Sequence, residues 1–297
     1  MADLWICQSF YKKRWKKEEE NAIMFRKGGK MEQDSKVLIF IKAIFMAIFY
    51  SFMGICVATI VASVSMEEYR AHPMLWIFLA ALFTIPFCVI QLNREGYLEK
   101  EKVWEWKNSS VIEWIVLVLF SISSCIALNY WITISGLMKV FRGFDKVAQT
   151  IYTGNLLEEF LAVVLAAPLV EELIFRGLAY QGFQRLWKKQ TAMVASALFF
   201  GIYHRNIVQG LYAFFIGLLL VYVFEWFGTI RAAILFHIAA NAASVVMTEC
   251  LDLRFLEKDF RALFIFTMFF TIVGIGSFGW LHSRKKNLIK KNKQALK

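Results

Sequence analysis

The chain has 297 residues, 59% of them apolar, with 29 phenylalanines, 10 tryptophans and a mean hydropathy of +0.52. One soluble core of this size cannot bury that much apolar surface, so the composition excludes an ordinary soluble domain and indicates a membrane protein. The formal net charge of +11 comes largely from basic residues near the two ends, which favours contact with anionic lipid over binding to nucleic acid. We therefore expect membrane lipid, and no nucleic acid, among the partners.

The apolar residues form long continuous runs, which predict an all-α, polytopic membrane protein because a helix satisfies its own backbone in lipid. The runs lack the short alternating pattern that is typical of an outer-membrane barrel. This layout divides the chain into a basic N-terminal segment (1–36), a helical membrane domain (37–281) and a basic tail (282–297). We expect eight transmembrane helices, at residues 37–66, 74–92, 111–138, 156–183, 192–209, 211–227, 230–250 and 262–281.

Basic residues predict the orientation of the spans. Nine Lys and Arg precede residue 37 and seven follow Leu281, so both termini are expected in the cytoplasm. The loop at 139–155 fits less well, because it is expected outside yet holds three basic residues against one acid. The compact basic flanks, with no organelle signal, favour a multi-pass protein of a bacterial plasma membrane, and a location in the endoplasmic reticulum stays open.

Three charged residues lie deep inside the fourth expected span. Glu172 and Arg176 are four residues apart, so they share one helix face and can pair. Glu171 lies about 140° from Arg176 around the axis and is left to face a cavity. Pro168, one turn earlier, leaves the carbonyl of Val164 without its helical partner, which predicts a kink or a water-accessible defect near Glu171. The alternative is that the three charges reach the membrane surface, but Glu171 is roughly 20 Å from the next basic turn.

Two of the four histidines fall within expected spans. His204 lies roughly 18 Å into the fifth span, close to the depth of Glu171, and His237 lies in the seventh span on the same face as Asn241. A single histidine in a membrane is usually explained by a hydrogen bond between helices. Their combination at overlapping depth predicts a shared polar interior. A glutamate, two histidines and an amide can supply a general base, a water-orienting group and oxyanion donors, a set suited to amide hydrolysis.

Three ordered motifs carry a resemblance to a known family: Glu171-Glu172-xxx-Arg176, Phe200-xxx-His204 and His237-xxx-Asn241. The sequence has no HExxH, no GxSG and no pair of intramembrane aspartates, so other classes of membrane protease do not fit. The motifs resemble the CPBP family, which includes the CAAX prenyl endopeptidases and the bacterial Abi-type membrane proteins. The resemblance places a catalytic core at about residues 156–250.

The resemblance implies an eight-helix intramembrane endopeptidase that hydrolyses a peptide bond of a membrane-associated, prenylated or otherwise lipidated peptide or protein. In that case Glu171 would activate water, and His204 would help to hold and polarise it. His237 and Asn241 would stabilise the oxyanion. The supporting residues implied by the resemblance are Glu172 and Arg176.

The metal dependence has two readings. Glu171, His204 and His237 could ligate Zn²⁺ and leave an open position for water. The alternative is a metal-free mechanism with no cofactor, which we favour because Asn241 and a histidine four residues earlier suit an oxyanion hole better than a ligand set.

Two further functions stay open beside proteolysis. The bacterial branch of the family is thought to include non-catalytic membrane partners, such as a bacteriocin self-immunity factor or a regulator of a sensor kinase. A proton-coupled transporter would also place Glu and His within spans, but it has no obvious need for the complete motif set.

Overall fold

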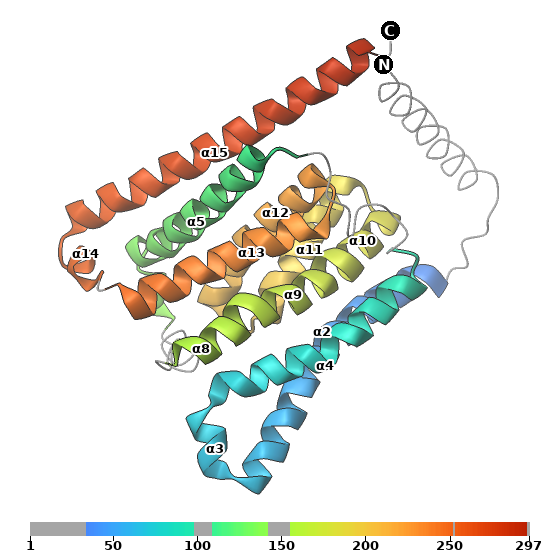
Figure 1. The fold of residues 1–297 in the computed structure, drawn as a ribbon, viewed down its shortest axis with the longest axis vertical. Helices are drawn as coiled ribbons and strands as arrows, with labels where there is room; N and C mark the ends of the chain where they lie inside the picture. The colour runs from blue at the N-terminus through green and yellow to red at the C-terminus, as the bar shows by residue number, and fades with distance from the viewer. Residues whose placement is uncertain (1–33, 98–108, 142–154, 252, 296–297) are drawn as a thin grey trace. The chain divides into compact units, whose positions relative to one another are not determined.

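The computed structural model describes residues 34–97, 109–141, 155–251 and 253–295 (Figure 1). Residues Ile39–His282 form one compact unit. Most of the basic N-terminal segment, and the cations Arg142 and Lys146 of the loop at 139–155, lie outside the described residues, so the predicted domain boundaries and orientation stay predictions.

The described residues contain helices and no strand, which confirms the all-α class. Three segments are π-helical (η), with one extra residue per turn. The elements are α2 (Asp34–Val64), α3 (Met66–Ala71), α4 (Pro73–Arg94), α5 (Val111–Ile134), α6 (Leu137–Val140), α8 (Leu156–Glu159), η1 (Phe160–Ala166), α9 (Ala167–Glu172), η2 (Leu173–Tyr180), α10 (Gln181–Leu186), α11 (Lys189–Tyr203), α12 (Ile207–Phe227), α13 (Ile230–Val245), η3 (Val246–Cys250), α14 (Arg254–Lys258) and α15 (Phe260–Ala295).

In the described part of the chain, six helices are long and apolar enough to cross a membrane. They are α2, α4, α5, α12, α13 with η3, and α15. The expected fourth span is present as the consecutive elements α8, η1, α9, η2 and α10, and the expected fifth span is the 15-residue α11. The protein is therefore a multi-pass membrane protein, whereas the count of eight crossings stays a prediction.

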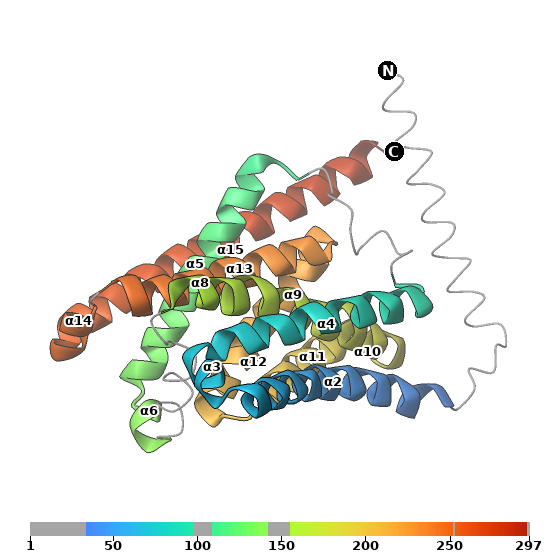
Figure 2. The same cartoon turned by 60° about the horizontal axis from the view of Figure 1, so that its bottom comes forward.

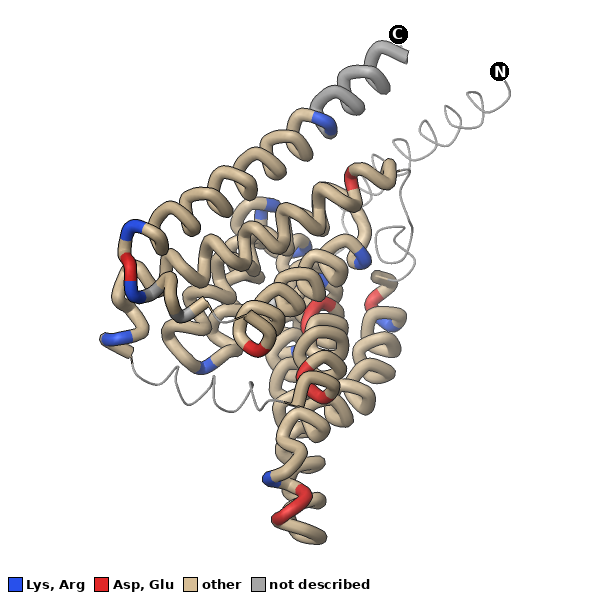
Figure 3. The backbone as a smooth tube through the Cα atoms, turned by 60° about the vertical axis from the view of Figure 1, so that its left-hand side comes forward, with Lys and Arg blue, Asp and Glu red and all other residues tan. Residues whose placement is uncertain are grey.

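The helices differ in how much of their surface the protein itself covers. Only 17% of the apolar window of α2 and 22% of that of α15 is buried, against 50% in α5. Long stretches of the helices carry no charged residue (Figure 3). Because exposed apolar side chains are stable in lipid, α2 and α15 have the surface of membrane-facing helices. Examples of these exposed side chains are Ile41, Phe45, Ile48, Phe52, Ile265, Phe269, Ile272 and Ile275.

Two glycines bring α11 and α12 into close contact. A Cβ atom added to Gly201 would lie 2.7 Å from the carbonyl oxygen of Gly210, and one added to Gly210 would lie 2.8 Å from that of Gly201. Neither position therefore has room for a side chain, and small residues allow such close approach of helices in membranes. This contact fixes the hairpin that carries His204.

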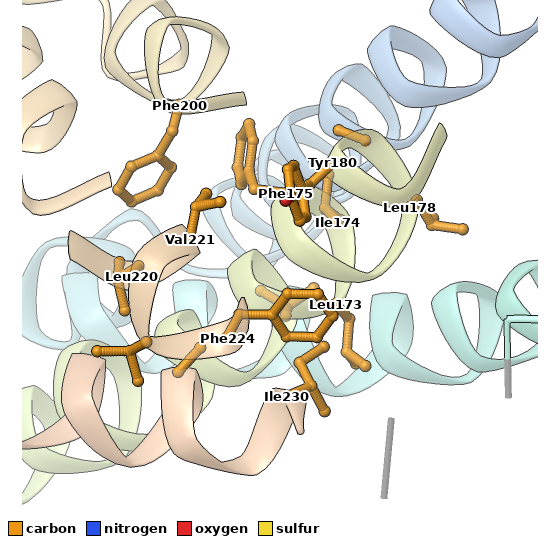
Figure 4. Packing of buried hydrophobic residues seen from close by; sticks show 14 of the residues in the cluster. Leu173, Ile174, Phe175, Leu178, Tyr180, Phe200, Leu220, Val221, Phe224 and Ile230 are labelled. Carbon is orange, nitrogen blue, oxygen red and sulfur yellow. The ribbon is translucent and has the colours of Figure 1, made fainter. Parts of the chain in front are cut away.

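The core that supports the site lies between η2, α11 and α12 (Figure 4). Here Leu173 and Phe175 of η2 pack with Phe200 of α11 and with Val221 and Phe224 of α12. Helix α13 packs against α5, α12, η1 and α9, and it lies beside α9 in both ribbon views (Figures 1 and 2). The three motif-bearing segments are thus neighbours in the fold.

The boundary between the fifth and sixth expected spans was wrong. We expected the fifth span to continue to residue 209, but α11 ends at Tyr203 and α12 begins at Ile207. The side chain of Asn206 accepts hydrogen bonds from the backbone N–H groups of Val208 and Gln209, which caps α12. His204 therefore lies at the end of a helix, in a tight turn, and not in the middle of a span.

Candidate active site

A cavity of about 430 Å³ lies within the compact unit, lined by residues from α2, α4, α5, η1, α9, α11, α12 and α13. Its volume falls within the roughly 300–1,000 Å³ of typical small-ligand sites. Glu171, His204, His237 and Asn241 all line it. The structure therefore brings together the four residues that the sequence predicted as catalytic.

The helix that carries Glu171 changes its hydrogen-bond register just before that residue. In η1 the N–H of Ala167 donates to the carbonyl of Ala162, five residues back. In that register the next donor would be Pro168, which has no N–H, and its acceptor would be Val163. The amide Nδ2 of Asn241 donates to the Val163 oxygen instead, at 2.8 Å. The backbone defect is present near Glu171, one carbonyl earlier than the sequence predicted.

Glu172 connects its own motif to the motif that begins at His237. Its Oε1 accepts a hydrogen bond from Nη1 of Arg176 at 2.9 Å and another from Nδ1 of His237 at 2.9 Å. Both members of the ion pair are completely buried. Arg176 also donates from Nη2 to the carbonyl of Gly217 at 3.1 Å, and its guanidinium lies 4.6 Å from the ring centre of Phe200. The pairing expected from the spacing is present, and the bond to His237 was not foreseen.

The bond from Glu172 orients His237. An ionised carboxylate can only accept, so Nδ1 of His237 is the donor and Nε2 points elsewhere. That Nε2 lies 3.8 Å from Oε2 of Glu171. The side chain of Glu171 is 12% exposed, whereas that of Glu172 is fully buried. The two adjacent acids therefore have different surroundings: Glu172 holds the imidazole, and Glu171 borders the cavity.

His204 is held by its own helix. Its Nδ1 donates to the carbonyl of Phe200 at 2.8 Å, because a carbonyl oxygen can only accept. This tautomer leaves the lone pair of Nε2 as an acceptor. The Phe200 ring makes edge-to-face contacts with His204 at 4.7 Å and with His237 at 5.8 Å between centroids. Phe200 thus contacts both histidines and the arginine.

The sequence interpretation missed several residues of the cavity wall. Tyr50 and Ser51 come from α2 and Asn129 from α5, and neither helix carries a recognisable motif. Arg205, which also lines the cavity, could have been found from the sequence. It is a cation inside the expected fifth span, where charge is costly and usually functional.

The donor set does not fit a metal site. In the described ranges, no group of three or more His, Cys, Asp or Glu side chains is arranged to hold a metal ion. Glu171, His204 and His237 line one cavity without forming such a group. The ring of Phe200 contacts both histidines from its side.

Residues 153–243 match the family model described as type II CAAX prenyl endopeptidase Rce1-like. The matched segment contains all three motifs and the helices that carry them. No curated protein and no solved structure matched the chain. The family match confirms the resemblance to the CPBP family over the segment that carries the site. The fold is that of a multi-pass membrane protein, and its segment 153–243 is similar to the type II CAAX prenyl endopeptidases.

Proposed function

We propose that the protein is an intramembrane endopeptidase that hydrolyses a peptide bond in a membrane-associated or lipidated peptide or protein, with water activated by Glu171. One observation carries the proposal. The carboxylate of Glu171 borders a cavity and faces Nε2 of His237, while Glu172 holds that imidazole from its other side. A base beside an oriented imidazole is the arrangement that general base catalysis requires.

The proposed roles follow from the donors and acceptors at the site. Glu171 takes a proton from the water, and the Nε2 lone pair of His204 accepts the water's other hydrogen and so orients it. His237 in its cationic form keeps its Nδ1 bond to Glu172 and presents Nε2–H to the developing oxyanion. Asn241 uses one of its two amide hydrogens on Val163 and has the second for the oxyanion.

Burial of the site adds to its chemistry. Glu172 and Arg176 are completely buried, so their fixed charges are weakly screened by solvent and hold His237 in one orientation. Such preorganised groups stabilise a charge that develops in the transition state without having to rearrange. The supporting pair thus acts on the reaction through His237.

The first test compares the wild-type protein with Glu171→Ala and His204→Ala variants on an S-farnesylated peptide and in comparative membrane proteomics. We expect each substitution to lower cleavage by about 10²-fold to 10⁴-fold, because each removes a group that handles a proton or the water. The variants should elute normally in size-exclusion chromatography, since neither residue belongs to the buried ion pair. Unchanged cleavage in either variant contradicts the assigned role.

The same assays separate the remaining alternatives. We propose a metal-free reaction, so activity should survive a chelator; activity that is lost and returns only with Zn²⁺ would contradict this. We also propose a bacterial plasma-membrane location. A strain that lacks the protein is compared with a strain that carries Glu171→Ala. If the Glu171→Ala strain keeps the wild-type phenotype while no peptide changes in its membrane proteome, the protein acts as a non-catalytic immunity factor or sensor-kinase regulator.

A further inference from the structure

Arg205 places a cation in the wall of the cavity that Glu171 borders. It follows His204 directly, in the turn between α11 and α12. Its guanidinium Nη2 donates to the hydroxyl oxygen of Ser51 on α2 at 3.0 Å, and both residues line the cavity. Among the described residues that line this cavity, the single acid is Glu171, the proposed base.

The backbone of Arg205 is unusual. Its φ of +56° makes it the single non-glycine residue with positive φ in the described part of the chain. L-residues with a side chain adopt this conformation at a cost, and Gly or Asn is the ordinary choice. Strained residues of this kind gather at active sites and ligand clamps. The strained backbone at Arg205 therefore favours a functional role for its side chain.

The charge of Arg205 lacks an acidic partner. Its hydrogen bond goes to a neutral hydroxyl, and it makes no ion pair with any residue that the structure describes. The side chain of Arg205 is exposed, and so is its hydrogen bond to Ser51. The guanidinium is therefore accessible to an anion that enters the cavity from outside the protein.

We propose that Arg205 binds the terminal α-carboxylate of a peptide substrate and so sets which peptide bond faces Glu171. The proposal rests on the peptidase function proposed above. A guanidinium is a planar fork that matches a carboxylate with two parallel hydrogen bonds. The cavity of about 430 Å³ admits a short chain end and not a folded domain. A free α-carboxylate is an anion that every unmodified C-terminus carries, whatever its sequence.

A carboxylate of a peptide fits these observations better than the phosphate of a lipid. Arg205 shares its cavity with Glu171, His204 and His237, so an anion bound there lies beside the reacting groups. A phospholipid in that place would occupy the reaction cavity itself. The test must nevertheless separate the two anions, since both suit a guanidinium.

The experiment compares two S-farnesylated peptides that differ only at their ends, one with a free carboxylate and one with a carboxamide. We expect the wild-type protein to prefer the carboxylate form in kcat/KM by about 10-fold to 100-fold, the range for a hydrogen bond to a charged group. Arg205→Gln should lose this preference through a higher KM for the carboxylate peptide. Arg205→Lys should keep part of it, and Arg70→Gln, on the exposed α3, should keep all of it.

A binding arm makes the result independent of turnover. Fluorescence anisotropy with Glu171→Ala protein compares both peptides before and after Arg205→Gln is added. Tighter binding of the carboxylate form that Arg205→Gln abolishes supports the proposal, even if the wild-type protein cleaves neither peptide and the peptidase assignment fails. Equal binding of the two forms overturns it.

A lipid arm identifies the other anion. Vesicles of phosphatidylcholine with and without phosphatidylglycerol are compared for the wild-type protein and for Arg205→Gln. The measured quantity is the cleavage rate of the carboxylate peptide. If Arg205→Gln removes a dependence of this rate on phosphatidylglycerol and leaves the carboxylate preference intact, Arg205 binds a lipid phosphate and the proposal is overturned.

Discussion

The helical run from α8 to α10 contains two Glu-Glu pairs, Glu158-Glu159 and Glu171-Glu172, whose surroundings differ. In each pair one acid contacts a histidine from a distant part of the chain. Nδ1 of His72 lies 2.5 Å from Oε1 of Glu158, and Nδ1 of His237 lies 2.9 Å from Oε1 of Glu172. In the second pair the neighbouring acid also lines the cavity; in the first pair neither does.

The comparison shows that an acidic pair with a histidine partner does not by itself make a candidate active site. What distinguishes the second pair is the surrounding set: a buried arginine that compensates Glu172, and a second histidine across a shared cavity. The Glu158 carboxylate instead accepts from Nδ2 of Asn155 at 2.6 Å, and Oδ1 of Asn155 caps the start of the helix by accepting from the backbone N–H of Glu158. The first pair has the contacts of a structural helix end.

The largest expected difference between the two pairs appears when one acid of each is replaced by alanine, and it affects both stability and cleavage. Glu172→Ala leaves Arg176 buried without its partner and should lower the free energy of unfolding by about 3–5 kcal/mol. It also removes the acceptor that orients His237, so cleavage should be lost. Glu158→Ala should cost only about 1–3 kcal/mol and leave cleavage near wild type. Thermal unfolding in detergent and peptide cleavage measure the two effects.

A double variant controls for a general loss of structure. Glu172→Ala with Arg176→Met removes both charges of the buried pair, so it should recover part of the lost stability. Cleavage should stay low, because His237 still lacks its acceptor. Recovery of cleavage in the double variant would show that Glu172 acts through charge balance alone.

A smaller effect is expected from the π-helical segment between the two pairs. Asn241→Ala leaves the carbonyl of Val163 without its side-chain donor, which should cost about 1–3 kcal/mol of stability. Loss of the second amide hydrogen should also reduce cleavage by about 10²-fold to 10³-fold if it serves the oxyanion. Destabilisation with unchanged kcat would assign Asn241 to the backbone alone. Asn241→Asp is the matched variant of similar size.

The smallest effect concerns the first pair and depends on pH. The hydrogen bond to Glu158 raises the pKa of His72, which lies between α3 and α4 outside the spans. A raised pKa means that the stabilisation is complete below the ordinary histidine pKa of about 6.5 and is lost as the pH rises through the raised value. The melting temperature of the wild-type protein should therefore exceed that of His72→Gln most at pH 5.5, and the gap should narrow by pH 8.5. A constant gap would exclude the charged pair.

The motif residues could be predicted from the sequence because they follow local rules. Spacing of four residues paired Glu172 with Arg176, and rise per residue placed Glu171, His204 and His237 at similar depth. The structure places all three in one cavity. Helical periodicity and charge in apolar runs are signals that a single chain carries.

The rest depends on contacts between segments distant in sequence. A π-helical turn at η1 needs Asn241 to satisfy Val163, and nothing near Val163 in the sequence announces that partner. The end of α11 follows from the cap at Asn206 and from the close approach of α12, a contact between two helices that the local sequence does not announce. Tyr50 reaches the cavity from a helix that has no motif.

The length of α11 connects the candidate site to the thickness of the membrane. A helix of about 22 Å matches a hydrocarbon layer thinner than average. With α11 spanning the bilayer from Lys189, we expect the turn at His204 to lie well below the head groups of a thick bilayer, where water is scarce, and to approach them in a thin one. Lipid chain length is then expected to control how readily water and an extended peptide reach Glu171.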